Sequence, residues 1–319
     1  MSAPTVQARS NPSARYHVVG EVIADVVRPV VGDVTTHAGG SPANVAYGLA
    51  RLGRAVTLRT ELGDDSHGEL ARHHLDSAGV TLATTRPASG RTASATAVLG
   101  PDGSATYEFD LTWDLADDTP AVGHHLHTGS IAAYLAPGAD VVARLARAAR
   151  ATSTVSFDPN IRAALLADPA AAHARLEELL GLSDIVKASD EDLRWLYPDE
   201  EPEDAACAWL QRGPGVVVLT RGAEGSVAFT AAGSVTVPSA PVTVVDTVGA
   251  GDSYMAALLD GLDTHHLLGA DRRGDLAAIG LDVLQATLER AARAAGITVS
   301  RAGANPPTAA ELDAACAPA

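Results

Sequence analysis

The sequence predicts an α/β protein with a central, mostly parallel sheet flanked by helices. Three observations carry this prediction. The chain has 319 residues, 46% of them hydrophobic, which is enough to bury a large core. From Tyr16 onward, short β-branched runs alternate with Ala- and Leu-rich amphipathic stretches, the pattern of strands followed by crossover helices. Glycine and proline are scattered without a period, which excludes the fibrous and disordered classes.

The hydrophobic pattern places the individual elements. Strands are expected where β-branched residues cluster, at Tyr16–Ile23, Ala55–Thr60, Thr154–Asp158, Asp184–Lys187 and Val216–Thr220. Helices are expected where apolar residues recur three and four positions apart, at Pro42–Leu52, His67–Ala78, Ala139–Ala149 and Ala170–Leu180. We interpret residues 1–15 as a disordered tail and residues 16–319 as one folded domain.

Two antiparallel hairpins depart from the alternating pattern. The first joins residues 92–99 to residues 105–111 through the turn-forming sequence GPDGS. Its residues Tyr107, Phe109 and Leu111 share one face, so the hairpin either covers the core or forms a small β lid over a ligand cleft. The second hairpin, Ser226–Thr230 with Ser234–Val237, is interpreted as structural only.

The composition excludes several classes of function. There are 23 Lys and Arg against 39 Asp and Glu, a net charge of −16 with His neutral, so we expect no nucleic-acid partner. No run approaches the roughly 18–20 apolar residues that span a bilayer, and the first residues lack the apolar segment of a signal peptide, so we expect a soluble protein without a membrane partner. Cys207 and Cys316 belong to no disulfide or zinc spacing, which favours a reducing cytoplasm.

The most informative stretch is a glycine-rich turn between a strand and a helix. It reads VVDTVGAGDS over residues 244–253 and leads into a helix with an apolar side at Met255, Leu258, Leu259 and Leu262. Gly249 and Gly251 let the backbone approach a ligand, and the amides of residues 249–252 would lie at the positive end of the helix dipole. The turn is therefore an anion site. It matches neither a Walker A loop nor a dinucleotide fingerprint.

Asp252 stands beside those amides and has two interpretations. Phosphoryl transfer needs positioning, charge stabilisation and a base for the attacking oxygen, and Asp252 is placed to be that base. The alternative is that Asp252 only caps the helix.

A second glycine-rich turn reads GGSPANVA over residues 39–46. Ser41 is a good N-cap and Pro42 suits the first helical position, but capping does not explain Asn44 or the two glycines. A polyol, whose hydroxyls need fixed donors and acceptors, accounts for Gly39, Gly40 and Asn44. Asp25, placed at the end of the first strand, would accept two further hydroxyls, although a single Asp there is more often a turn residue.

Together, GGSPANVA and DTVGAGDSY resemble the two motifs of the ribokinase/PfkB family of carbohydrate kinases. Their order and wide separation match the family, and the resemblance runs from VVGE at residues 18–21 to SRAGANP at residues 300–306. It implies a ribokinase-like fold, with a kinase domain over residues 16–319 and a small β lid built from segments near residues 25–37 and 90–114. The resemblance therefore favours the lid interpretation of the first hairpin.

The resemblance also implies residue roles. In that family the sugar lies between lid and core, touched by the residues that match Asp25, Gly39, Gly40 and Asn44. The residue that matches Asp252 deprotonates the hydroxyl. The amides that match Gly249, Ala250 and Gly251 form the anion hole for the transferred phosphoryl group.

Shorter stretches resemble further family elements. The DPNIR element of fructokinase-like members places Asp158 and Asn160 beside the substrate and Arg162 on a phosphate. KASDED, residues 187–192, lies where the family has an NxxE motif linked to magnesium and its waters. Here Ser189 and Asp192 replace Asn and Glu, so the metal role of Asp192 stays open.

The nucleotide side of the site is implied by the same resemblance. The residues that it places there are Lys187, Ser189, Thr220, Gly222, Gly225 and Asn305. The region of Asp246 is implied to bind a monovalent cation, K⁺.

The sequence thus predicts an ATP- and Mg²⁺-dependent sugar kinase that phosphorylates a primary hydroxyl. Fructose is the best-supported substrate, because of the GGSPANVA and DPNIR elements and the expected aromatic lid surface of Tyr107, Phe109 and Trp113. Ribose, 2-keto-3-deoxygluconate and nucleosides stay open as alternatives, since relatives bind them on the same scaffold. The apolar hairpin face could equally pair with its copy in a homodimer.

Two rivals from other classes are less well supported. A non-catalytic sugar sensor on a kinase fold would tolerate loss of the base, but Asp252 and its flanking glycines are intact. A nucleotide-binding module without kinase chemistry would not need the sugar-side turn. The paired histidines lack the spacing of metal ligands and are expected to be solvated surface residues; they are His73, His74, His124, His125, His127, His265 and His266.

Overall fold

The computed structural model describes residues 15–100, 105–115, 123–166 and 168–316. The predicted tail lies outside the described residues except for Arg15, which begins the first strand. Residues 101–104 of the first hairpin turn also lie outside them.

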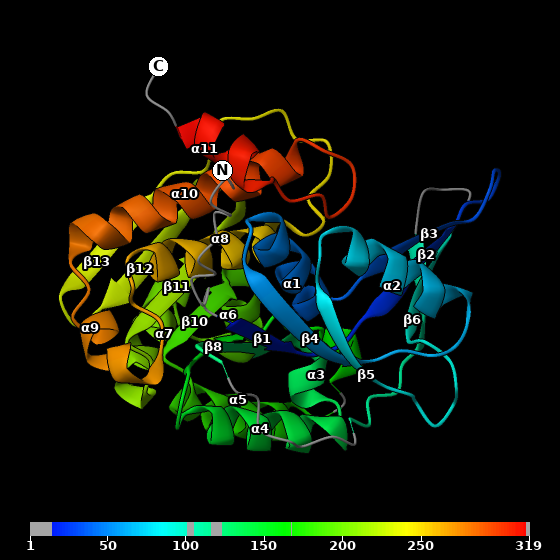
Figure 1. The fold of residues 1–319 in the computed structure, drawn as a ribbon, viewed down its shortest axis with the longest axis horizontal. Coiled ribbons are helices and arrows are strands. Elements are labelled where there is room, and N and C mark those ends of the chain that lie inside the picture. The colour runs from blue at the N-terminus through cyan, green and yellow to red at the C-terminus, as the bar shows by residue number, and fades with distance from the viewer. Residues whose placement is uncertain (1–14, 101–104, 116–122, 167, 317–319) are drawn as a thin grey trace, which may run out of the picture.

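A nine-stranded sheet of described residues forms the centre of the fold (Figure 1). The strand order is β13-β12-β11-β10-β9-β8-β1-β4-β5, parallel from β11 to β5 and antiparallel at β11-β12 and β12-β13. The strands are β1 (Arg15–Val19), β4 (Ala55–Glu61), β5 (Thr81–Thr85), β8 (His125–Gly129), β9 (Thr154–Asp158), β10 (Ile185–Ser189), β11 (Val216–Thr220), β12 (Ser226–Thr230) and β13 (Gly233–Val237). The predicted α/β class with a mostly parallel sheet is confirmed.

Helices cover both faces of this sheet (Figure 1). One face packs against α1 (Ser41–Arg51), α2 (Ser66–Ser77), α8 (Ala250–Thr264), α9 (Arg273–Ala277), α10 (Leu281–Val299) and α11 (Ala309–Cys316). The other packs against α3 (Ser130–Tyr134), α4 (Gly138–Ala149), α5 (Pro169–Leu182), α6 (Asp190–Leu196) and α7 (Pro202–Trp209). Short 3-10 turns are η1 (Ala163–Leu165), η2 (Leu210–Arg212), η3 (Gly222–Glu224) and η4 (Ala270–Arg272).

The element boundaries follow the prediction with two departures. β9 and β11 have the predicted bounds, and each predicted helix is present to within two residues at either end. The predicted strand Tyr16–Ile23 instead ends at Val19, and the chain leaves the central sheet before Ile23. The central strand β8 is missing from the prediction because its sequence, HLHTG, contains no apolar run.

A second sheet of four described strands projects from one end of the central sheet (Figure 1). Its order is β3-β2-β6-β7, and its strands are β2 (Ile23–Arg28), β3 (Thr35–Gly39), β6 (Ser94–Leu99) and β7 (Ala105–Asp110). β6 and β7 form the predicted antiparallel hairpin. The segments near residues 25–37 and 90–114, predicted to form a lid, supply these strands. We call this structure the small sheet.

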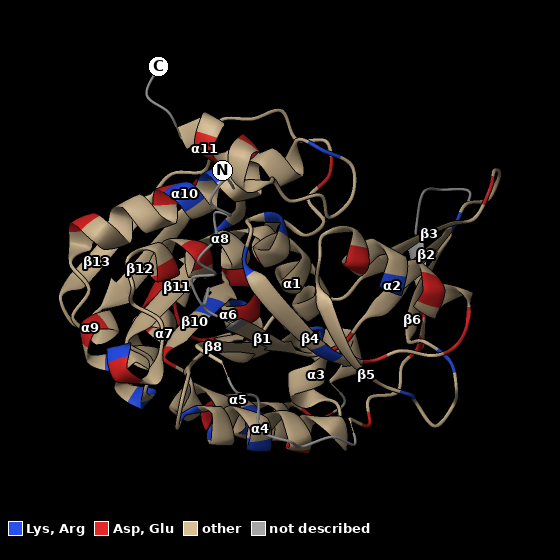
Figure 2. Cartoon of the chain, in the orientation of Figure 1, with Lys and Arg blue, Asp and Glu red and all other residues tan. Residues whose placement is uncertain are grey.

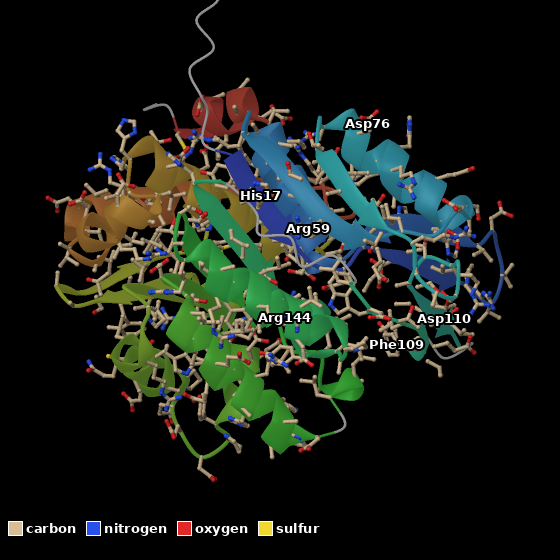
Figure 3. All side chains as sticks on the ribbon, turned by 60° about the horizontal axis from the view of Figure 1, so that its bottom comes forward. His17, Arg59, Asp76, Phe109, Asp110 and Arg144 are labelled. Carbon is tan, nitrogen blue, oxygen red and sulfur yellow. The ribbon has the colours of Figure 1, made fainter. Side chains whose placement is uncertain are left out.

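The hairpin does not cover the core. Tyr107 is 61% and Phe109 43% exposed, so the core-covering alternative is wrong. Figure 3 shows Phe109 and Asp110 on the rim of the small sheet. Trp113, expected beside these aromatics, is instead buried and packs against Gly138, because a buried indole contributes more apolar contact than an exposed one.

Two of the histidines expected at the surface are buried in β8. His125 and His127 are both 0% exposed and share hydrogen bonds with Ser156 Oγ, at 2.7 Å from His125 Nε2 and 2.9 Å from His127 Nδ1. Burial, with the nearby charge of Lys187, lowers the pKa of His127 to about 3, so its ring stays neutral. Within the described residues, no group of three or more His, Cys, Asp or Glu side chains is placed to hold a metal ion.

Charged residues lie mainly on the outward faces of the flanking helices (Figure 2). Arg144 is one example, on the exposed side of α4 (Figure 3). In the described part of the chain, no helix combines the length and apolar character needed to cross a membrane.

Candidate active site

A cavity of about 860 Å³ lies between the small sheet and the carboxyl ends of the central strands. This is the edge at which open α/β sheets bind ligands. The predicted site residues that line it are Asp25, Gly40, Asn44, Asp158, Asn160, Arg162, Lys187, Ser189, Asp192, Gly249, Ala250, Gly251 and Asp252. Segments far apart in sequence thus meet in one cavity.

Asp252 lies in the first turn of α8, at the wall of this cavity, and is only 9% exposed. Ser41 Oγ donates to Asp252 Oδ1 at 2.6 Å, and Asn44 Nδ2 donates to Oδ2 at 2.8 Å. Burial raises the pKa of Asp252, while these two hydrogen bonds and the charges of Lys187 and Arg162 oppose the rise. Gly249, not Asp252, is the N-cap of α8, so the alternative in which Asp252 only caps the helix is wrong.

The turn before α8 has the geometry of an anion site. Gly249 has a φ of 75°, and a Cβ there would lie 2.6 Å from Ala304 Cβ, so only glycine fits. The Ala250 amide donates to Thr247 O at 3.3 Å. Among the described residues, no partner is found for the amides of Gly251 and Asp252. These two amides are available to an anion at the positive end of α8.

The turn between β3 and α1 explains the two adjacent glycines. Gly40 has a φ of 100°, and a Cβ there would lie 2.5 Å from the carbonyl oxygen of Glu21. A Cβ on Gly39 would overlap the Asp25 carboxylate, so Gly39 supports Asp25 rather than lining the cavity itself. Asp25 lies within β2 and not, as expected, at the end of a core strand, because the chain has already entered the small sheet. Burial raises the pKa of Asp25, opposed by His37 and Arg162.

A buried ion pair forms the floor of the cavity. Lys187 Nζ lies 2.8 Å from Asp158 Oδ2, and neither residue is more than 3% exposed. Burial alone would lower the pKa of Lys187, but Asp158, Asp192 and Asp252 outweigh it, and the pKa lies above its ordinary value. Burial raises the pKa of Asp158 to about 6 despite Lys187. Asp158 Oδ1 has no partner among the described residues.

The loop after β9 carries Asn160 and Arg162. Asn160 has a φ of 39°, a left-handed conformation that asparagine tolerates better than most residues. Arg162 Nη1 donates to Asn160 Oδ1 at 2.7 Å, and the rest of the Arg162 side chain is exposed at the mouth of the cavity. Arg162 is therefore placed to meet a negatively charged group entering the cavity.

Ser189 and Asp192 form a capping box at the start of α6. Ser189 Oγ accepts from the Asp192 amide at 3.0 Å, and Asp192 Oδ2 accepts from the Ser189 amide at 2.8 Å. Asp192 Oδ1 accepts from the Ile161 amide at 2.6 Å, which fixes the loop that carries Asn160 and Arg162. Both carboxylate oxygens of Asp192 are thus already engaged.

A second cavity of about 480 Å³ adjoins the first along Thr247, Ala250 and Gly251. Thr220, Gly222 and Gly225, which were expected on the nucleotide side, line it. Most of the remaining wall is small and apolar and includes Ala240, Pro241, Val242, Ala292, Ala295, Gly296 and Val299. Asn305 is exposed and does not line this cavity.

Asp246 joins two loops beside the second cavity. It accepts hydrogen bonds from the amides of Val248 at 3.0 Å and Gly303 at 2.9 Å, which lower the pKa of Asp246. The carboxylate therefore stays ionised and holds the segment before α8 against the segment after α10.

Comparisons with known proteins agree with this arrangement. Residues 14–311 match the pfkB family of carbohydrate kinases. The chain belongs to this family. It is 37% identical to a fructokinase from Rhizobium leguminosarum bv. trifolii over 73% of each chain.

Two solved structures resemble this carbohydrate kinase over nearly its whole length. One is a fructokinase from Xylella fastidiosa with bound ATP, with a TM-score of 0.82, 27% identity and coverage of 94% of this chain and 97% of that one. The other is a fructokinase double mutant from Vibrio cholerae with fructose, ADP and a potassium ion bound, with a TM-score of 0.79, 25% identity and coverage of 96% and 99%.

Two residues of the site have no predicted role in it. Ser41 is expected as an N-cap, but its hydroxyl instead binds Asp252 from the first position of α1. Glu21 lines the cavity, where its Oε2 accepts from the Ala132 amide at 2.9 Å and its Oε1 has no partner among the described residues. Burial raises the pKa of Glu21 to about 7. Neither contact is visible in sequence, since both partners lie more than a hundred positions away.

Replacing Glu21 by glutamine should make the stability of the enzyme less dependent on pH. The folded pKa of about 7 lies above the ordinary 4.5, so the folded state holds the proton more tightly and stability falls as pH rises from about 4.5 to about 7. Glutamine does not titrate, so the Glu21→Gln variant should not lose this stability. Between pH 4.5 and pH 7, its free energy of unfolding should rise relative to that of wild type by on the order of 2–3 kcal/mol.

Urea unfolding of both proteins at several pH values measures this difference. The exposed Glu69→Gln is the matched control and should show no such trend. If the difference in unfolding free energy between Glu21→Gln and wild type stayed constant or shrank as pH rises, the raised pKa of Glu21 would be contradicted.

Proposed function

We propose that this chain is an ATP-dependent fructokinase that transfers the γ-phosphate of ATP to a primary hydroxyl of fructose. The observation that carries the proposal is the position of Asp252. Its buried carboxylate lines the larger cavity, next to Gly251, which lines both cavities, and beside the two unpaired amides of Gly251 and Asp252. The Rhizobium fructokinase and the fructose-bound Vibrio structure support fructose as the substrate.

In the proposed reaction Asp252 accepts the proton of the primary hydroxyl. The hydroxyl oxygen forms a bond to the γ-phosphorus, the bond from that phosphorus to the β–γ bridging oxygen breaks, and ADP leaves with that oxygen. The unpaired amides of Gly251 and Asp252, with Arg162 and Lys187, supply donors and positive charge for the transferring phosphoryl group. Lys187 is buried, which makes its electrostatic contribution larger than it would be in water.

The sugar would bind in the larger cavity. Asp25 and Asn44 offer an acceptor and a donor to its hydroxyls, and Asp158 Oδ1 and Asn160 lie within the same walls. Gly39 and Gly40 act by allowing the turn before α1 to approach β2. The exposed rings of Tyr107 and Phe109 on the small sheet would cover the sugar as a lid and exclude water.

ATP would place its base in the apolar cavity beside Thr220, Gly222 and Gly225 and its phosphates toward Gly249–Gly251. Mg²⁺ neutralises phosphate charge when bound, and it usually takes one or two carboxylates, waters and the phosphates rather than a protein cage. Asp158 Oδ1, which has no partner among the described residues, would be the carboxylate oxygen that binds Mg²⁺. Both oxygens of Asp192 are engaged, so Asp192 would contact the ion through a water molecule. The loops around Asp246 are the proposed site of K⁺.

We also propose a homodimer formed through the small sheet. Val30, Val31 and Val34, at the end of the β2–β3 hairpin, are 57%, 89% and 56% exposed, an apolar edge that a second copy would cover. The free thiols of Cys207 and Cys316 support a cytoplasmic location.

A sedimentation experiment tests the dimer. Sedimentation equilibrium should give wild-type protein a mass of twice the 32.5 kDa of the chain, and Val31→Asp should shift the population toward the monomer. A single-chain mass for wild type at micromolar concentration would remove the dimer while leaving the kinase proposal intact.

A substrate panel tests the reaction. ADP release is measured with Mg-ATP over fructose, ribose, 2-keto-3-deoxygluconate, glucose and adenosine, with and without K⁺. Fructose should give a kcat/KM well above the others. A clear preference for another compound would replace the substrate, whereas silence across the panel from folded, ATP-binding protein would favour the sugar-sensor alternative.

The variant Asp252→Asn tests the base. It keeps the size and hydrogen-bonding capacity of the side chain but cannot accept the proton, so kcat should fall by a factor on the order of 10² or more. Fructose and ATP binding, measured by calorimetry, should persist. The exposed Asp282→Asn, in the first turn of α10, is the matched control and should retain wild-type turnover. Near-normal turnover of Asp252→Asn would remove it from the role of base.

A further inference from the structure

The hydroxyl of Ser41 joins the N-terminal ends of α1 and α8. It donates to Asp252 Oδ1 at 2.6 Å across a separation of 211 residues, and this hydrogen bond is buried. The bond from Asn44 to Oδ2 is only partly buried. Both donors line the cavity, but Oδ2 has the less enclosed of the two hydrogen bonds, so we assign Oδ2 to the substrate hydroxyl and Oδ1 to the anchor.

Ser41 is itself held rigidly. It is 6% exposed and is followed by Pro42, whose ring packs where Gly20 has no side chain. Further along the same helix pair, a Cβ on Gly48 would lie 2.9 Å from Ala256 Cβ, which shows how closely α1 and α8 approach. The donor atom and the carboxylate are thus carried by two elements whose separation cannot vary freely.

We propose that Ser41 is a positioning residue for the base: its hydroxyl anchors Oδ1 of Asp252 so that Oδ2 stays ionised and aimed at the substrate hydroxyl. The inference rests on the proposed function of Asp252. A carboxylate with one oxygen anchored can receive a proton on the other without rotating away. Asn44 cannot replace this anchor, since it holds the oxygen that must also receive the substrate hydroxyl.

Loss of the anchor should change the ionisation of Asp252. Ser41 and Asn44 both oppose the rise in the pKa of Asp252 that burial causes. The charged groups that act on Asp252 from the neighbouring elements are Lys187 on β10 and Asp158 and Arg162 on and after β9. Ser41→Ala leaves all three in place, so the only donor removed is the hydroxyl.

The test is the pH dependence of fructose phosphorylation by Ser41→Ala. A hydrogen bond to a charged group is worth enough to move a pKa by about one unit. The acid limb of kcat/KM for fructose should therefore move to higher pH by about one unit. Near neutral pH kcat should fall about tenfold, while fructose and ATP dissociation constants should stay within about threefold of wild type.

Ser253→Ala is the matched control. Ser253 is the next residue of α8, is equally buried, and accepts a hydrogen bond from Thr298 at 2.8 Å without contacting Asp252. If Ser41 served only to join helices, both variants would show the same unchanged pH limb. Ser41→Cys keeps the side-chain volume but donates weakly, so it should move the limb in the same direction by less and provides a second variant should Ser41→Ala not fold.

The outcomes separate the two claims. A shifted limb for Ser41→Ala and an unshifted one for Ser253→Ala support the positioning role. A wild-type limb for Ser41→Ala, together with inactive Asp252→Asn, overturns the role of Ser41 alone. Full activity of Asp252→Asn overturns the assignment of the base and this inference with it.

Discussion

The two hydrogen bonds that hold the Asp252 carboxylate against α1 are the constraint on which the rest of the site depends. They join residues 211 and 208 positions apart and place a carboxylate, only 9% exposed, at the wall of the larger cavity. A carboxylate at such depth is costly unless its oxygens are paired, so the turn before α1 and the start of α8 must meet in one arrangement. The glycines at 39, 40 and 249 are the means by which the backbone reaches it.

The same principle governs the floor of the cavity. Lys187 and Asp158 are buried charges that compensate each other, with Lys187 Nζ 2.8 Å from Asp158 Oδ2. Asp192 holds the loop that carries Arg162 through Oδ1 and caps α6 through Oδ2, which binds Ser189. These three charged side chains lie at one edge of the sheet, although both faces of the sheet are packed with apolar side chains. The apolar core therefore keeps the sheet rigid, while the polar side chains of the site lie at its edge.

Much of the fold could be predicted because it depends on local periodicity, as in β9, β11 and α4. β8 could not, since its buried histidines are compatible with the core only through Thr154 and Ser156 on the next strand. In the site, Asp252 and its glycines stand in a contiguous motif and were predicted together. The bond from Ser41 to Asp252 and the burial of Glu21 depend on tertiary contact, which no local pattern encodes. Trp113 illustrates the converse, because an aromatic residue beside a lid strand is equally compatible with the core.

The measurement that tests this account most directly is a crystal structure of the protein with fructose and a non-hydrolysable ATP analogue. We expect a primary hydroxyl of fructose within roughly 2.6–3.2 Å of Asp252 Oδ2. We also expect the terminal phosphate at the amides of Gly251 and Asp252, and Ser41 still bound to Oδ1. A sugar whose primary hydroxyls lie away from Asp252, or a terminal phosphate held elsewhere in the cavity, would contradict the central role of this carboxylate.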